Sequence, residues 1–225
     1  MMLSAQQVIA LHSQCLDQPD WPASDAAVAQ QAAGQTPDGT PPVWFWVAAN
    51  HRFNSLLWAE EDLARRTTVG AAEIAANKRA IDGFNQARND ATERVDELLL
   101  IALGLVDAAS ARSDCPLSTV PPGARLNSET AGSIIDRMAI MALKVHAMRA
   151  QTERRDVDTG HIEASRSKLA RLQQQRADLG DCLDALIADA QAGRAYFKVY
   201  RQFKMYNDAR FNPALVAEAK AKAKA

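Results

Sequence analysis

Polar residues that could bind a ligand fall within the apolar stripe of a long predicted helix, residues 71–109. The stripe repeats every three to four residues, as expected for one face of an α-helix. Its polar members are Asn85, Arg88 and Asp96, with Asn89 and Glu93 at its edge. A charge buried without a partner is costly, so we expect Arg88 and Asp96 to meet opposite charges or a ligand from neighbouring helices. The opposite face, which we predict to be solvated, carries Arg79, Asp90, Arg94 and Glu97.

A second polar group lies on a predicted helix of residues 128–155, which is apolar nearly all the way round. Its narrow polar sector contains Ser133, Asp136, Arg137 and Lys144 within about 100°. A carboxylate and two cations at this spacing could surround a small anionic ligand. An internal salt-bridge network would use the same residues, and the pattern leaves both interpretations open.

The predicted helix of residues 43–67 carries a polar stripe beside its apolar face. The stripe contains His51, Asn54, Trp58, Glu61, Asp62 and Arg65. A tryptophan in the middle of such a stripe is unusual for a solvated face. We therefore expect another element to cover the stripe in part.

Residues 194–208 are predicted to form a short helix with aromatic residues on one face. Basic residues occupy the other face, and Lys204 lies between the two. A basic rim with aromatic residues could bind a phosphorylated or sugar ligand. A helix docked by its aromatic face, with solvated lysines, explains the pattern more simply.

Sequence motifs for metal ions and nucleotides are almost absent. The four histidines share no i, i+4 pair and the three cysteines are widely spaced, so a zinc or thiolate site is not expected. Glu93 and Asp96 form an E-x-x-D pattern, and acidic residues 60–62 lie on the preceding helix. This resembles half of the magnesium-binding pattern of all-helical nucleoside triphosphate pyrophosphohydrolases. Those enzymes carry E-x-x-E where this chain has consecutive acids, so the match is partial.

The elements that must position these residues are helices. Alanine is abundant, and nearly all glycine and proline lies at segment boundaries. Capping signals at Ser4, at Ser128 or Thr130, and at Asp158 begin helices that run to about residues 16, 155 and 193.

With the helices at 43–67 and 71–109, these signals predict an all-α fold in a single domain of residues 1–225. The arrangement we expect is an up-and-down bundle of four long helices with short helices added at both ends. The proline-rich segment 110–127 is long enough to form a lid. Residues 214–225, rich in alanine and lysine, are expected to be a solvated end.

The overall composition limits which binding partners and which cellular compartment we expect for the protein. With 26 basic and 27 acidic side chains and a net charge of −1, the chain has no field that would hold nucleic acid. The longest apolar runs are too short to span a membrane, and three cysteines argue against a disulfide framework. We therefore expect a cytoplasmic protein that does not bind nucleic acid; composition predicts neither a cofactor nor an oligomeric state.

Three segments of the chain resemble a known family. They are residues 50–58 (NHRFNSLLW) with the acids that follow, residues 126–137 and residues 200–208. Over roughly residues 43–213 the chain is similar to the bacterial family called domain of unknown function 4254. Members are often encoded near, or fused to, glycosyltransferases of lipopolysaccharide and other surface-glycan pathways. The resemblance implies a helical bacterial protein that serves envelope-glycan assembly, with a glycosyltransferase as a candidate partner.

Together these observations lead to the hypothesis of an internal polar site for a small anionic or sugar-phosphate ligand. The candidate catalytic groups are Asp136, Asp96 and His51. The candidate ligand-binding residues are Asn54, Asn85, Arg88, Asn89, Arg137, Lys144, Lys204 and Asn207. No metal ligand is assigned. Two alternatives remain: a non-catalytic scaffold for a glycosyltransferase, in which polar residues fix helix register, and a magnesium-dependent nucleotide pyrophosphohydrolase.

Overall fold

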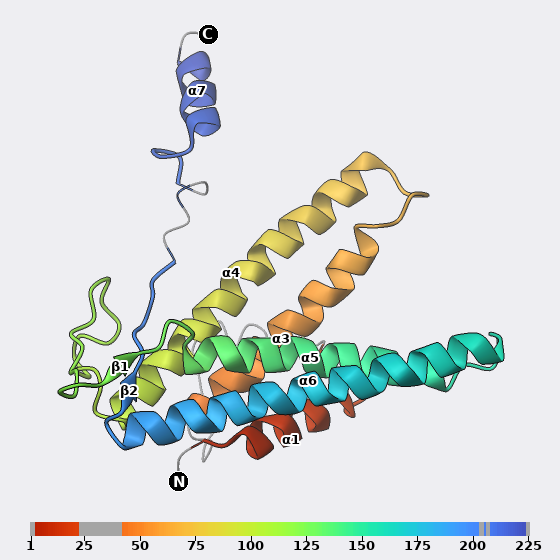
Figure 1. Cartoon of the computed structure of the whole chain (residues 1–225). Coiled ribbons are helices and arrows are strands. Elements are labelled where there is room, and N and C mark those ends of the chain that lie inside the picture. Colours follow the sequence, from red (N-terminus) through yellow and green to blue (C-terminus); the bar gives the residue numbers. More distant parts are fainter. Residues whose placement is uncertain (1–2, 23–41, 203–204, 206–207, 224–225) are drawn as a thin grey trace.

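The computed structural model describes residues 3–22, 42–202, 205 and 208–223, whose regular structure is almost entirely helical (Figure 1). The helices are α1 (Ala5–Leu16), α3 (Pro42–Leu63), α4 (Ala71–Ala102), α5 (Ala131–Thr152), α6 (Thr159–Gln191) and α7 (Pro213–Lys222). Two short strands, β1 (Arg125–Leu126) and β2 (Ala195–Tyr196), pair in parallel. The predicted all-α fold is confirmed. Lys204 and Asn207 lie outside the described residues.

The four long helices form two antiparallel hairpins, α3–α4 and α5–α6. Figure 1 shows the hairpins close together near the two strands and diverging toward their other ends. Helix α1 packs against α3, α5 and α6. The largest group of buried apolar residues joins these helices and includes Val8, Val47, Val95, Leu99, Ile135, Met138, Leu183 and Phe197. The hairpins therefore share a core at one end, and α5 faces both α3 and α4.

Local sequence signals explain where three helices begin. Ser4 forms a capping box with Gln7 at the start of α1. The Thr130 hydroxyl accepts a hydrogen bond from the Ser133 amide at 3.1 Å and starts α5. Asp158 accepts from the His161 amide at 2.7 Å and starts α6. All three caps agree with the prediction, because each is formed by residues within one helical turn.

Helix α4 ends before the predicted residue 109. Leu103 is its C-cap, and Gly104 follows with φ of +69°, the left-handed conformation with which glycine commonly ends a helix. The chain then re-enters the core at Val106, which forms an isolated antiparallel bridge with Ser118. Residues 110–127 line none of the cleft described below, so the structure does not support their interpretation as its lid.

The prediction of a helix over residues 194–208 is wrong for residues 194–202, in which the structure shows no helix. After α6 the chain turns at Gly193, where φ is +69°, and forms β2, which pairs with β1. Phe197 follows in the core with 1% of its surface exposed. This pairing joins segments about 70 residues apart, so no local pattern indicates it. Helix α7 stands away from the hairpins in Figure 1 and buries none of its residues, in agreement with a solvated end.

Over the ranges that the structure describes, no helix is both long enough and apolar enough to cross a membrane.

Candidate functional site

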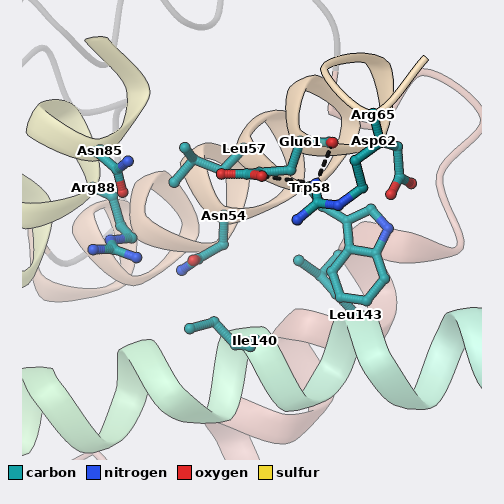
Figure 2. Close-up of a pocket in the computed structure, with 10 residues that line it drawn as sticks. All are labelled: Asn54, Leu57, Trp58, Glu61, Asp62, Arg65, Asn85, Arg88, Ile140 and Leu143. Atoms are coloured by element: carbon teal, nitrogen blue, oxygen red, sulfur yellow. Dashed lines mark hydrogen bonds and ion pairs between the residues drawn. The ribbon is translucent and has the colours of Figure 1, made fainter. Parts of the chain in front are cut away.

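Side chains of α3, α4 and α5 line a cleft of about 310 Å³ between the two hairpins. Its lining comprises Asn54, Leu57, Trp58, Glu61, Asp62, Arg65, Asn85, Arg88, Ile140 and Leu143. Figure 2 shows the two α4 residues, Asn85 and Arg88, at one end, and Trp58 with the charged residues of α3 at the other. Apolar side chains lie between them. The cleft thus has a polar end, an apolar middle and an aromatic end with a charged rim.

Asp136 of α5 accepts hydrogen bonds from two residues of α3 beside the polar end of the cleft. Its Oδ1 accepts from Nδ2 of Asn50 and from Nδ2 of Asn54, both at 2.8 Å. Asn50 Nδ2 also donates to Thr92 Oγ1 of α4 at 3.0 Å, so the network joins three helices. The Asn54 amide nitrogen is used within this network. Its Oδ1 makes no hydrogen bond to any residue the structure describes, which leaves an acceptor for a ligand.

Arg88 is the cation of the polar end. Its Nε lies 3.8 Å from Asp136 Oδ1, close enough for Coulombic attraction but too far for a hydrogen bond. Nη2 donates to Asn89 Oδ1 at 3.2 Å, and Nε is buried without a hydrogen-bond partner in the described part of the chain. The side chain is 25% exposed. Most of its donors therefore have no partner among the residues that the structure describes, as expected of a residue that contacts an anion.

Three of the predicted ligand-binding residues line this cleft: Asn54, Asn85 and Arg88. The Asn85 side chain has no hydrogen-bond partner among residues 3–22, 42–202, 205 and 208–223, so its amide is also available. Asn89 is buried and donates to Gln202 Oε1 at 2.9 Å. It supports Arg88 and the segment after β2 and does not line the cleft.

The polar wedge predicted on α5 is divided between two sides of the helix. Arg137 and Lys144 are exposed and line a separate groove of about 570 Å³ between α5 and α6. Arg137 forms an ion pair there with Glu129. Ile140 lines both the groove and the cleft, so α5 separates them. The structure does not bring Arg137 and Lys144 to the ligand site that contains Arg88.

His51 of α3 lies in the interior, where α3 packs against α1. Its ring centroid is 4.4 Å from that of His12 and 5.3 Å from that of Trp21. Both imidazoles are fully buried, and the His12 ring has no hydrogen-bond partner among the described residues. Burial lowers the pKa of His51 to about 3 and holds the pKa of His12 well below its usual value. His51 does not line the cleft, so its geometry does not support the predicted catalytic role.

Asp96 joins α4 to the N-terminus of α5. Its Oδ1 accepts from the Gly132 amide at 2.6 Å. A Cβ added at Gly132 would lie 2.6 Å from the Thr92 carbonyl oxygen, so the close approach of the helices requires glycine. Burial raises the pKa of Asp96 to about 7, against the lowering effect of hydrogen bonds from Thr130 and Gly132. Asp96 therefore acts as a buried cap, away from the cleft.

The carboxylates of the partial E-x-x-D pattern are dispersed. Glu61 and Asp62 line the cleft, whereas Glu93 pairs with Arg201 and Asp96 caps α5. Within the described ranges, no group of three or more histidine, cysteine, aspartate or glutamate side chains is placed to hold a metal ion. The arrangement gives no support to the pyrophosphohydrolase alternative.

A second charged cluster, which sequence reasoning missed, covers the C-terminal part of α4. Arg201 pairs with Glu93 at 2.8 Å and with Glu97 at 2.6 Å, and it donates to two backbone carbonyls of the loop after α4. Arg94 also pairs with Glu97, whose side chain is 2% exposed. The prediction that Arg94 and Glu97 are solvated is wrong, because the loop after α4 and the segment after β2 cover that face. Helical periodicity carries no signal for such coverage.

A family model matches most of the chain. The family is described as protein of unknown function (DUF4254), and the match spans residues 44–199. This range contains every residue that lines the cleft, whereas α1 and α7 lie outside it. No curated protein and no solved structure matches the chain.

Proposed function

Because the chain belongs to the DUF4254 family, whose description names no activity, we propose a function from the cleft itself: binding of a small anionic ligand between α3, α4 and α5. The observation that carries the proposal is the unused hydrogen-bonding capacity of Arg88. Its buried Nε has no hydrogen-bond partner in the described part of the chain, and its nearest carboxylate, on Asp136, is 3.8 Å away. The exposed part of its guanidinium lines the cleft, where an anion could accept charge-assisted hydrogen bonds from the Nη groups.

The residues around Arg88 divide into ligand contacts and positioning residues. Asn54 and Asn85 line the same end of the cleft and would contact the ligand beside Arg88. Asp136 is a positioning residue, because it holds Asn54 by a 2.8 Å hydrogen bond and attracts Arg88. The proposal is one of binding, and it assigns no residue of the cleft to a chemical step.

Replacing Arg88 by methionine should weaken the binding of inorganic phosphate about 10- to 100-fold, because a hydrogen bond to a charged group contributes about 1.5–3 kcal/mol. Titration calorimetry at low ionic strength measures this directly. Arg137→Met is the matched control, since Arg137 lies in the other groove. It should leave phosphate binding unchanged. Equal affinities for wild type and Arg88→Met, or no binding by wild type, would contradict the proposal.

The scaffold alternative is favoured by a different observation. Asp136 Oδ1 already receives two hydrogen bonds from asparagines of α3 within the protein. Such a closed network is what helix registration requires, with or without a ligand. The phosphate titration separates the two functions, because a scaffold needs no anion at Arg88.

The pathway and the compartment rest on the family resemblance. We propose that the ligand belongs to surface-glycan biosynthesis, that the protein acts in the cytoplasm, and that a glycosyltransferase is its partner. The reason for proposing this pathway is the association of the family with glycosyltransferases. The cleft adds only a suitable binding site. Unchanged surface glycans in a strain that lacks the gene would contradict the pathway.

A further inference from the structure

The aromatic end of the cleft indicates which chemical group forms the uncharged part of the ligand. We infer that this part is a monosaccharide ring, which packs on Trp58 while a phosphate attached to the ring contacts Arg88. The inference rests on the proposed function and adds the ligand class and its orientation.

Trp58 presents an aromatic surface at a fixed distance from the polar end. The side chain is 36% exposed, and Figure 2 shows the indole beside Leu143, at the end of the cleft opposite Arg88. Trp58 follows Asn54 by four residues on α3, so the two lie on one face about 6 Å apart along the helix.

The charged rim at the aromatic end selects hydroxyl groups. The Glu61 carboxylate pairs with Arg65 at 2.8 Å, whereas the Asp62 carboxylate has no hydrogen bond or ion pair with any residue that the structure describes. A carboxylate accepts hydrogen bonds and repels a phosphate. This end of the cleft therefore disfavours a second anionic group and offers an acceptor to hydroxyl donors.

The middle of the cleft suits the apolar face of a sugar ring. Leu57 of α3 and Ile140 and Leu143 of α5 line it, together with the indole of Trp58. A pyranose ring is amphipathic, with C–H groups on its faces and hydroxyls around its edge. Its face can pack on the indole and leucine side chains while its edge reaches Asp62. A simple anion such as sulfate would leave this half of the cleft unused.

The test compares ligands that share a phosphate and differ in the ring. Calorimetry measures the binding of three kinds of ligand to wild type, Trp58→Ala and Trp58→Phe. The ligands are several hexose 1-phosphates, glycerol 3-phosphate and uridine monophosphate. At least one hexose 1-phosphate should bind wild type about tenfold more tightly than glycerol 3-phosphate and should quench tryptophan fluorescence. Trp58→Ala should remove this advantage and leave glycerol 3-phosphate binding unchanged. Trp58→Phe, which keeps a smaller ring, should be intermediate.

Failure of this inference is distinguishable from failure of the proposed function. If glycerol 3-phosphate binds in an Arg88-dependent way but Trp58→Ala does not weaken hexose 1-phosphate binding, the ring does not pack on Trp58 and the anion site stands. Tighter, Trp58-dependent binding of uridine monophosphate would place a base on the indole and overturn the monosaccharide. If no phosphate compound binds wild type, both the inference and the proposed function fail.

Discussion

Replacing Arg201 by methionine should lower the free energy of unfolding by about 3 kcal/mol. The Arg201 side chain is 14% exposed and pairs with Glu93 and with Glu97, which is more deeply buried. Methionine preserves much of the apolar stem but leaves the carboxylates without this partner. Removing one member of a buried ion pair is destabilising because the remaining charge is poorly compensated, and here only Glu97 keeps a second partner, Arg94. The midpoint of urea unfolding should fall at an unchanged slope.

The same substitution should loosen the loop after α4. Arg201 donates to the Ala111 carbonyl at 2.8 Å and to the Ser113 carbonyl at 3.1 Å, so it holds the loop against α4. Amide hydrogen exchange in residues 107–119 should accelerate more than in α5. Arg201→Lys keeps the charge but loses the planar fork of donors, so its effect should be intermediate.

Arg210→Met is the matched control for Arg201→Met. Arg210 also pairs with an acid, Asp208, at 2.7 Å, but its side chain is 81% exposed. An exposed pair of this kind contributes little, so the unfolding midpoint should stay at the wild-type value. If Arg201→Met matched Arg210→Met in stability, the cluster around Arg201 would be shown not to hold the segment after β2 in place.

The parts of the fold that the sequence predicts correctly depend on residues close together in the chain. The caps at Ser4, Thr130 and Asp158 each involve contacts within one turn, and all three agree with the structure. The segment after α6 shows the opposite case. Its aromatic and basic residues would fall on opposite faces of a helix, but pairing with β1 and burial of Phe197 determine its conformation. Long-range contacts outweigh local preference there.

The candidate site shows the same limit at the level of side chains. Periodicity correctly indicates that Arg88 and Asp136 point toward neighbouring helices, where they lie 3.8 Å apart. It cannot indicate which neighbour a residue meets. Arg137 is adjacent to Asp136 in sequence but faces α6, because α5 has packed neighbours on several sides. Asn50, which bonds to Asp136, could have been found from its i, i+4 relation to Asn54.

Lowering the pH from 7.5 to 5 should destabilise the fold through His12 and His51. Burial is the main cause that keeps their folded-state pKa values far below the usual 6.5, and Arg176 further disfavours both cations. The unfolded chain therefore binds more protons than the folded chain below pH 6.5. The stability due to each neutral histidine is fully present above 6.5 and is lost as the pH falls. At pH 5 the loss is about 2 kcal/mol for His51, and His12 changes the stability in the same direction.

Asp96 opposes this effect over the same range. Its folded-state pKa is raised to about 7 from a usual value of 3.8, so between these values the folded chain holds a proton that the unfolded chain does not. This contribution to stability is present at low pH and is lost as the pH rises through 7. From pH 7.5 to 5 it adds about 2 kcal/mol, which offsets the loss at one histidine and leaves a net loss of stability from the three groups.

A single substitution separates the two effects. His12→Leu removes one buried imidazole and leaves Asp96 unchanged, so the free energy of unfolding should become nearly independent of pH between 7.5 and 5. At pH 5 this variant should lose less stability than wild type, by urea midpoints measured at each pH. His146→Leu, which replaces an exposed histidine of α5, should follow the wild-type curve. Parallel curves for wild type and His12→Leu would mean that His12 takes up its proton without opening the interface of α1 with α3, contrary to its burial.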